Sequence, residues 1–155
     1  MSRKATIGSL VSKCGKIVLI MIILILYRVG DNGKFLGVGG TFNLNEEKAV
    51  DVEIMASGIF VGYLVYNLSV LITYLLTGER IINDCIMNVL GLFMWIAVAG
   101  TALHYWDNYA HQHQFDITGN ERSSGLALGS LCVFNAFLHL ADSAFSIKLY
   151  LDKSK

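Results

Sequence analysis

Four long apolar stretches, separated by shorter polar ones, dominate the pattern along the chain. We expect membrane-spanning helices over 10–30, 54–76, 86–105 and 125–150, each between 20 and 26 residues long. About 20 helical residues cross a hydrocarbon core of about 30 Å, whereas barrel strands are only about ten residues long and alternate in polarity. The pattern therefore predicts an all-α membrane protein, in which residues 1–155 form one domain, a four-helix transmembrane bundle.

The count of four depends on the first segment, whose uncharged stretch covers only 17–27. This helix crosses the membrane if Lys13, Lys16 and Arg28 extend their charges to the lipid headgroups. A secretory signal peptide is the competing interpretation. Because Arg28 directly follows the apolar stretch, where a signal peptide has small residues for cleavage, we favour a retained helix.

The composition is typical of a membrane protein. Hydrophobic residues make up 54% of the chain and charged residues 15%, and the mean hydropathy is +0.55. A soluble domain of this size could not bury so much apolar surface in one core. Twelve basic and twelve acidic side chains cancel, so the chain lacks the cationic excess that binds nucleic acid. The lipid bilayer is the expected partner.

The basic residues set the expected orientation. Eight of the twelve lie in the N-terminal segment, in the 77–85 turn and at the C-terminus. By the positive-inside rule, both termini face the cytosol, and 31–53 and 106–124 are extracellular loops. The outer side carries eight acidic residues against four basic ones. Because the cytosolic segments are too short for a catalytic domain, the protein is expected to act within the membrane or at its outer face.

The first outer loop begins with Asp31-Asn32-Gly33, a sequence typical of a tight turn. Apolar residues among glycines follow, and we expect a short extended segment or hairpin that lies on the outer leaflet. The spacing Gly37-x-Gly39-Gly40 is similar to a phosphate-binding turn. Because no lysine and helix start follow it, we do not infer a nucleotide site.

The second outer loop contains His111 and His113, and His104 lies just before it. A His-x-His pair can ligate zinc, but no further fixed ligand stands nearby, so we interpret both as solvated loop histidines. These histidines are also the only candidates for the site of a membrane-embedded enzyme. We therefore expect no enzyme, no catalytic residue, no metal site and no cofactor.

The three cysteines are placed away from both outer loops, so no extracellular disulfide is expected. Cys14 and Cys85 fall at the cytosolic boundary of the membrane, and Cys132 lies within the fourth helix. Cysteines at such a boundary are candidates for reversible palmitoylation, and a reduced, unmodified thiol is the alternative for each.

Pairs of glycines four residues apart occur in two of the predicted helices. Gly58 and Gly62 share one face of the second helix, and Gly125 and Gly129 share one face of the fourth. Small residues at this spacing let helix backbones approach closely in a membrane. We interpret both pairs as packing within the bundle, and contact with the helix of a partner is the alternative.

Three polar residues, Asn135, His139 and Asp142, form one stripe of the fourth helix. An ionisable group at membrane depth costs at least ~2.5–3.5 kcal/mol, so it faces the interior with a partner. We interpret the stripe as a hydrogen-bonded polar clamp, with Asp142 either protonated or paired with His139 or Lys148. A proton or ion relay through Asp142 and His139 is the alternative. Transporters show broken helices or internal repeats around such sites, and this chain has neither proline nor a detectable repeat.

The order of short motifs along the chain resembles the Snakeskin family, the four-span proteins of arthropod smooth septate junctions. The likeness covers nearly the whole chain and includes ILYR (25–28), FLGVGGTFNLNEEK (35–48), ASGIFVG (56–62), IMNV (86–89), FMW (93–95) and ALHYW (102–106). It is most specific in the first outer loop. Phe42 stands where the family pattern has tryptophan, a conservative aromatic change.

This resemblance implies a structural role. The protein would lie in the plasma membrane at lateral cell–cell junctions and help to assemble them and to seal the paracellular route, together with Mesh and a junctional tetraspanin. The first outer loop would be a contact surface shaped by Phe35, Gly37, Gly39, Gly40 and Phe42. The small-residue faces would be lateral docking surfaces, with which a homo-oligomer is also compatible. A small transporter or channel component that uses Asp142 and His139 is the alternative function.

Overall fold

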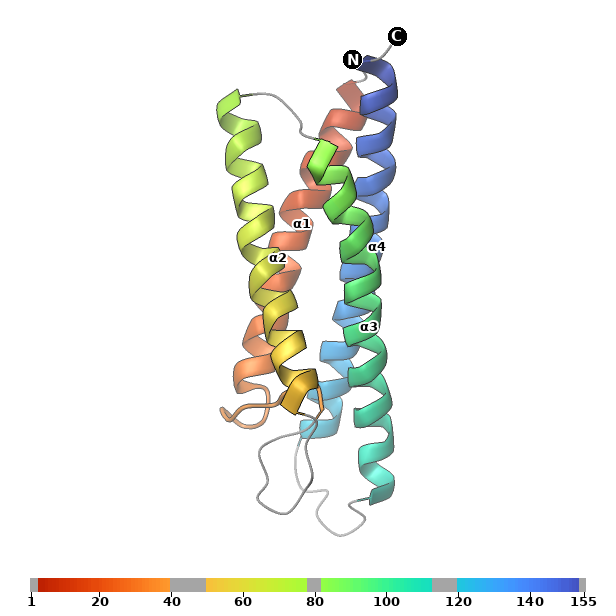
Figure 1. Cartoon of the computed structure of the whole chain (residues 1–155). Coiled ribbons are helices and arrows are strands. Elements are labelled where there is room, and N and C mark those ends of the chain that lie inside the picture. The colour runs from red at the N-terminus through yellow and green to blue at the C-terminus, as the bar shows by residue number, and fades with distance from the viewer. Residues whose placement is uncertain (1–2, 40–49, 78–81, 113–119, 154–155) are drawn as a thin grey trace.

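The computed structural model describes residues 3–39, 50–77, 82–112 and 120–153. These residues form four α-helices and, within the same ranges, no β-strand: α1 (Arg3–Val29), α2 (Val50–Thr77), α3 (Ile82–Gln112) and α4 (Glu121–Lys153). All four are long and apolar enough to cross a membrane. The predicted all-α, four-helix transmembrane architecture is therefore confirmed (Figure 1).

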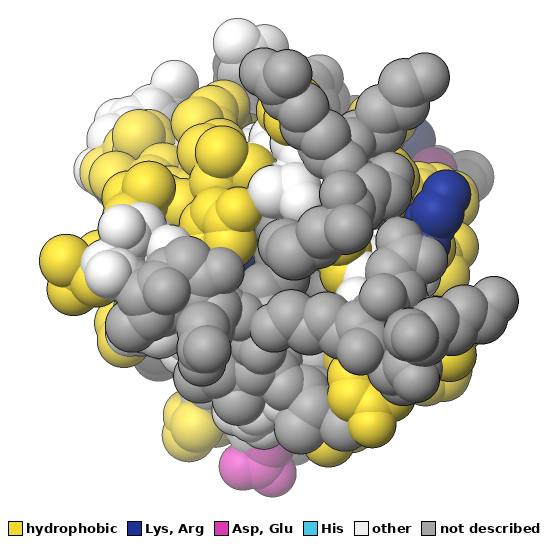
Figure 2. All heavy atoms as spheres, turned by 90° about the horizontal axis from the view of Figure 1, so that it is seen from above, with side chains coloured by type: hydrophobic (Ala, Val, Ile, Leu, Met, Phe, Trp, Pro, Cys, Tyr) yellow, Lys and Arg dark blue, Asp and Glu magenta, His cyan; other side chains and the backbone are white. Residues whose placement is uncertain are grey.

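Both termini lie at the same end of the bundle, as an even number of crossings requires (Figure 1). We call this the terminus end and the opposite end the loop end. Seen from the terminus end, hydrophobic side chains gather around most of the rim of the described surface (Figure 2). An apolar rim is what a bundle surrounded by lipid presents.

The helices are longer than the apolar stretches that predict them. α3 continues through Trp106 to Gln112, and α4 begins at Glu121, so the predicted outer loop 106–124 is helical at both of its ends. Hydropathy marks only the part of a helix that lies in hydrocarbon, whereas backbone hydrogen bonding continues into the polar interface. Glu121 lies in the first turn of α4, where its carboxylate interacts favourably with the positive end of the helix dipole.

The fourth helix supplies the closest packing in the bundle. A Cβ atom added to Gly125 would overlap the indole ring of Trp106, and one added to Gly129 would approach a methyl carbon of Leu103 to 2.8 Å. Both glycines therefore let α4 approach α3, as expected for packing within the bundle.

The glycine pair on α2 does not pack within the bundle, which corrects the prediction for Gly58 and Gly62. Both are exposed, and a Cβ atom at either would meet no atom of the described chain within 4 Å. The reason is the position of Phe60 midway between them. Phe60 is fully buried, and two residues turn a helix by about 200°, so the two glycines face outward.

Aromatic side chains join α2 to its neighbours. The Phe60 ring stacks on Trp95 of α3 with 5.3 Å between centroids and meets Tyr27 of α1 edge-on at 5.2 Å. Toward the terminus end α2 leaves the other helices (Figure 1), and Leu75 and Leu76 are 69% and 80% exposed. α2 and α3 are antiparallel, as consecutive membrane spans must be, and α4 rather than α2 packs most closely on α3.

The chain turns back onto the bundle after α1. Asn32 and Gly33 have φ angles of +47° and +86° between the bridged residues Asp31 and Lys34, which confirms the predicted tight turn. Leu36 is fully buried, so this segment packs against the helices at the loop end instead of lying on the outer leaflet.

The carboxylate of Glu53 fixes the segment that follows this turn. Its Oε1 accepts hydrogen bonds from the backbone N–H groups of Val38 and Gly39 at 2.8 and 2.6 Å. Phe35 packs edge-on against Tyr27 with 4.8 Å between ring centroids. Gly40 and Phe42, two residues of the predicted contact loop, lie outside the described residues.

We expect Gly125→Ala and Gly58→Ala to differ in their effect on stability. The first forces a methyl group into the Trp106 ring and should lower the free energy of unfolding by about 1–3 kcal/mol. The second adds a methyl group to an exposed helical position and should be neutral or slightly stabilising. Thermal unfolding in mild detergent measures both. Equal losses in the two variants would contradict this assignment of inner and outer faces.

Candidate functional site: a buried ion cluster

Four charged side chains meet inside the bundle, in the half nearest the terminus end. Lys13 and Lys16 come from α1, Asp84 from the first turn of α3 and Asp142 from α4. We call these four residues the ion cluster. Lys16 and Asp142 are fully buried, and Lys13 and Asp84 are 2% and 3% exposed.

Asp142 lies at the centre of the ion cluster. Its Oδ2 atom lies 2.8 Å from the ammonium nitrogen of Lys13 and 2.8 Å from that of Lys16. Lys13 also donates to both carboxylate oxygens of Asp84, at 2.7 and 2.6 Å. Two positive and two negative charges are therefore in direct contact, and the net charge of the cluster is zero.

Neutral side chains complete the hydrogen bonding around these charges. The Asn88 amide donates to Asp142 at 3.1 Å and to Asp84 at 3.3 Å, while its oxygen accepts from Lys16 at 2.6 Å. The hydroxyl group of Ser9 donates to the second carboxylate oxygen of Asp142.

Two further residues extend the network. Nδ1 of His139 lies 3.0 Å from the Asn88 oxygen, and the hydroxyl group of Tyr66 on α2 lies 3.4 Å from Asp84. All four helices thus contribute a side chain to the ion cluster or its hydrogen-bond shell. The network therefore fixes how the four helices meet at this level.

This geometry corrects two predictions. Lys13 and Lys16 do not extend to the headgroups, because anionic partners lie at the same depth inside the bundle. Asp142 is paired with these two lysines and not with His139 or Lys148. The sequence pattern does not single out Asp84. The signal that could have located the cluster is that these acidic and basic residues all stand near the same end of their predicted spans.

Only part of the predicted polar clamp is connected by hydrogen bonds to the ion cluster. His139 contacts the shell of the ion cluster through Asn88. The amide group of Asn135, one turn nearer the loop end on α4, has no hydrogen-bond partner in the described chain. Cys14 is exposed and Cys85 is partly exposed. Their palmitoylation stays a prediction. His113 and the side chain of His111 lie outside the described parts of the structure, and His104 lies 3.4 Å from the Asn108 amide.

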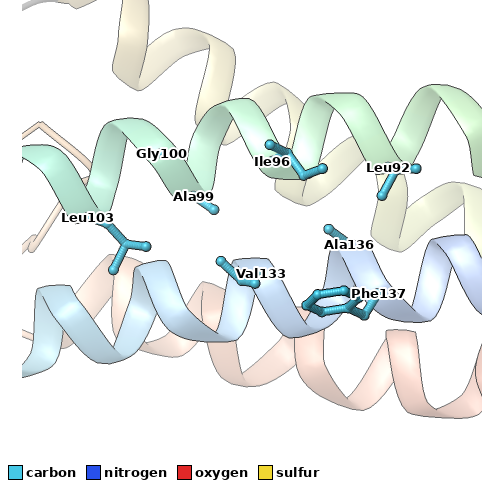
Figure 3. A pocket seen from close by; sticks show the side chains of 8 residues that line it. All are labelled: Leu92, Ile96, Ala99, Gly100, Leu103, Val133, Ala136 and Phe137. Atoms are coloured by element: carbon cyan, nitrogen blue, oxygen red, sulfur yellow. The ribbon is translucent and has the colours of Figure 1, made fainter.

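A groove of about 250 Å³ lies between α3 and α4 on the outside of the bundle (Figure 3). Its walls are formed by aliphatic and aromatic side chains and one glycine: Leu92, Ile96, Ala99, Gly100, Leu103, Val133, Ala136 and Phe137. Such a surface suits a lipid chain and offers no group for acid–base or nucleophilic chemistry.

The fold and this site define a class: a multi-pass membrane protein whose bundle is organised around buried ion pairs. The chain is 52% identical over 145 residues to Protein snakeskin of Bombyx mori, a match that covers 92% of each chain. It is 47% identical over 146 residues to Protein snakeskin of Drosophila melanogaster, covering 91% of this chain and 89% of that protein. The chain therefore belongs to the snakeskin family, which confirms the resemblance. No protein-family model matches it, and no solved structure does.

We expect Asp142→Asn to destabilise the bundle strongly. The substitution leaves two buried ammonium groups with one carboxylate, and removing one partner of a buried ion pair costs about 3–5 kcal/mol. Adding Lys16→Met restores the charge balance and should recover part of the loss. Unfolding in detergent gives the free energy of unfolding of each variant.

The matched control is Asp107→Asn. Asp107 pairs with Arg122 at 3.0 Å, but its side chain is 73% exposed, so its removal should cost less than about 1 kcal/mol. If Asp142→Asn were no more harmful than Asp107→Asn, the ion cluster would not hold the bundle together.

Proposed function

We propose that this protein is a structural, non-enzymatic component of smooth septate junctions, which supports junction assembly and the paracellular barrier. The observation that carries the proposal is membership of the snakeskin family over about nine-tenths of the chain. The junctional role itself is what the resemblance to this family implies. In this arrangement both termini face the cytosol, and the loop end faces the space between cells.

The distribution of polar groups supports a structural role. The buried charges neutralise one another inside the bundle, and their carboxylates accept hydrogen bonds from neighbouring side chains. What remains for contact is the lipid-facing surface and the loop end. A protein with such surfaces acts by lateral packing and by loop contacts.

The outward face of α2 is the lateral surface that we propose for partner helices. Gly58 and Gly62 lie exposed there, and α2 is the helix that stands farthest from the others at the terminus end (Figure 1). Exposed small residues let a second helix approach closely. By the family resemblance, the proposed partners are Mesh and a junctional tetraspanin.

The loop end provides the proposed outer contact. Phe35, Gly37 and Gly39 are held by their neighbours at the point where the chain leaves α1. The backbone N–H groups of Leu36 and Gly37 both donate to the Tyr27 carbonyl, at 3.1 and 3.3 Å. This anchor fixes where the first loop starts, and we propose that the loop then contacts other junction proteins.

The alternative, transport through the bundle, has less support. The polar network runs from the ion cluster to His139, and Asn135 lies one turn beyond it, but the buried side chains farther toward the loop end include the apolar Val98, Ala102 and Leu128. A proton or ion path needs polar groups or water along its whole length. We therefore favour the scaffold.

Depletion in a gut-type epithelium tests the proposed function. We expect the protein at lateral membranes, and we expect paracellular tracer leakage to rise when it is depleted and to recover on re-expression. Intact tracer exclusion after depletion would contradict the proposal, as would solute or proton flux through the intact protein in liposomes.

Gly58→Leu combined with Gly62→Leu tests the proposed docking face. The double variant should fold, because nothing in the described bundle contacts these positions, yet it should fail to concentrate at junctions. The matched control is Ala127→Leu with Ala144→Leu, two exposed small residues of α4. If both double variants localised normally, docking through α2 would be wrong.

A further inference from the structure

Three buried polar side chains near the middle of the bundle have hydrogen-bonding atoms without a partner in the described chain. They are both amide atoms of Asn135, the indole nitrogen of Trp95 and Nε2 of His139. All three residues are 0% exposed. Leaving such groups unpaired inside a membrane protein is costly, because neither lipid nor apolar side chains can replace the lost hydrogen bond.

The register of α3 and α4 brings these three residues together. Along the antiparallel pair, Asn88 contacts Asp142, Gly91 faces His139, and Gly129 faces Leu103. The same register places Trp95 opposite Asn135.

Contacts with His139 agree with this placement. The Trp95 ring stacks on the His139 ring with 6.4 Å between centroids. Asn135 stands one helical turn from His139, which separates their Cβ atoms by about 5–6 Å. The three side chains therefore lie within about one helical turn of one another.

Their hydrogen-bonding capacities are complementary. Nδ1 of His139 lies 3.0 Å from the Asn88 oxygen, so the ring donates there and a neutral ring leaves Nε2 as an acceptor. The Trp95 indole N–H is a donor only, and the Asn135 amide both donates and accepts. One small molecule with donors and acceptors could pair with all three.

We propose that an ordered water molecule binds between Asn135, Trp95 and His139. Water offers two donors and two acceptors, and buried waters make about three hydrogen bonds, the number of side chains that converge here. The bound water extends the hydrogen-bond network of the ion cluster, through Asn88 and His139, to the middle of the bundle. The Phe60 ring also stacks on Trp95, with 5.3 Å between the ring centroids.

Water-edited solid-state NMR on the full chain in lipid bilayers tests this proposal. We expect magnetisation from water to reach the Trp95 indole N–H and the Asn135 amide severalfold faster than it reaches the backbone amides of Ile20 and Val98. Those two residues lie in the apolar core, 0% and 1% exposed. Transfer to Trp95 and Asn135 no faster than to Ile20 and Val98 would overturn the proposal, and this measurement needs no variant.

Asn135→Leu provides a second, independent test. If water is bound, the variant removes one of its three partners, so transfer to the Trp95 indole should slow and the Tm should fall by about 2–4 °C, as the loss of one hydrogen bond would produce. If the region is dry, leucine removes an unpaired amide, and an unchanged or higher Tm overturns the proposal. Phe134→Leu, at a neighbouring position that is 61% exposed, is the control and should change neither quantity.

Discussion

The two lysines of α1 impose the constraint on which the remaining structure depends. A charged group inside the membrane costs at least ~2.5–3.5 kcal/mol unless it has a partner, and α1 carries two such groups one turn apart. Asp142 and Asp84 provide the partners. Apolar helix faces gain little by leaving lipid for one another, so these ion pairs select one arrangement of α1, α3 and α4 from many with similar apolar packing.

The other contacts follow from that arrangement. Gly125 and Gly129 bring α4 close to α3, and aromatic rings around Phe60 attach α2 at its middle. Tyr66 provides the only described contact of α2 with the ion cluster itself, at 3.4 Å. α2 is therefore the helix held least by charge, and the outward position of its glycine pair is consistent with a surface for partners. In this account, the interior holds the protein together and the exterior carries its function.

Much of the fold could be predicted from the sequence, because the length of an apolar stretch and the residues of a tight turn are local properties. The four spans, the common end of the termini and the Asn32-Gly33 turn needed no tertiary information. The directions of Lys13 and Lys16 could not be predicted from their own segment, since snorkelling and burial differ only in whether another helix places an anion nearby. Similarly, the spacing of Gly58 and Gly62 shows that they share a face but not which face is inward. The burial of Phe60 between them determines that both glycines face outward.

The central claim is that α1 is held by direct contact between lysine ammonium groups and Asp142 inside the membrane. Solid-state NMR on selectively labelled protein in bilayers can detect dipolar transfer between Nζ of Lys16 and the side-chain carboxyl carbon of Asp142. With 2.8 Å between the nitrogen and the nearer oxygen, we expect clear transfer and slow exchange of the ammonium protons with water. No transfer, together with exchange as fast as at the exposed Lys148, would contradict the account.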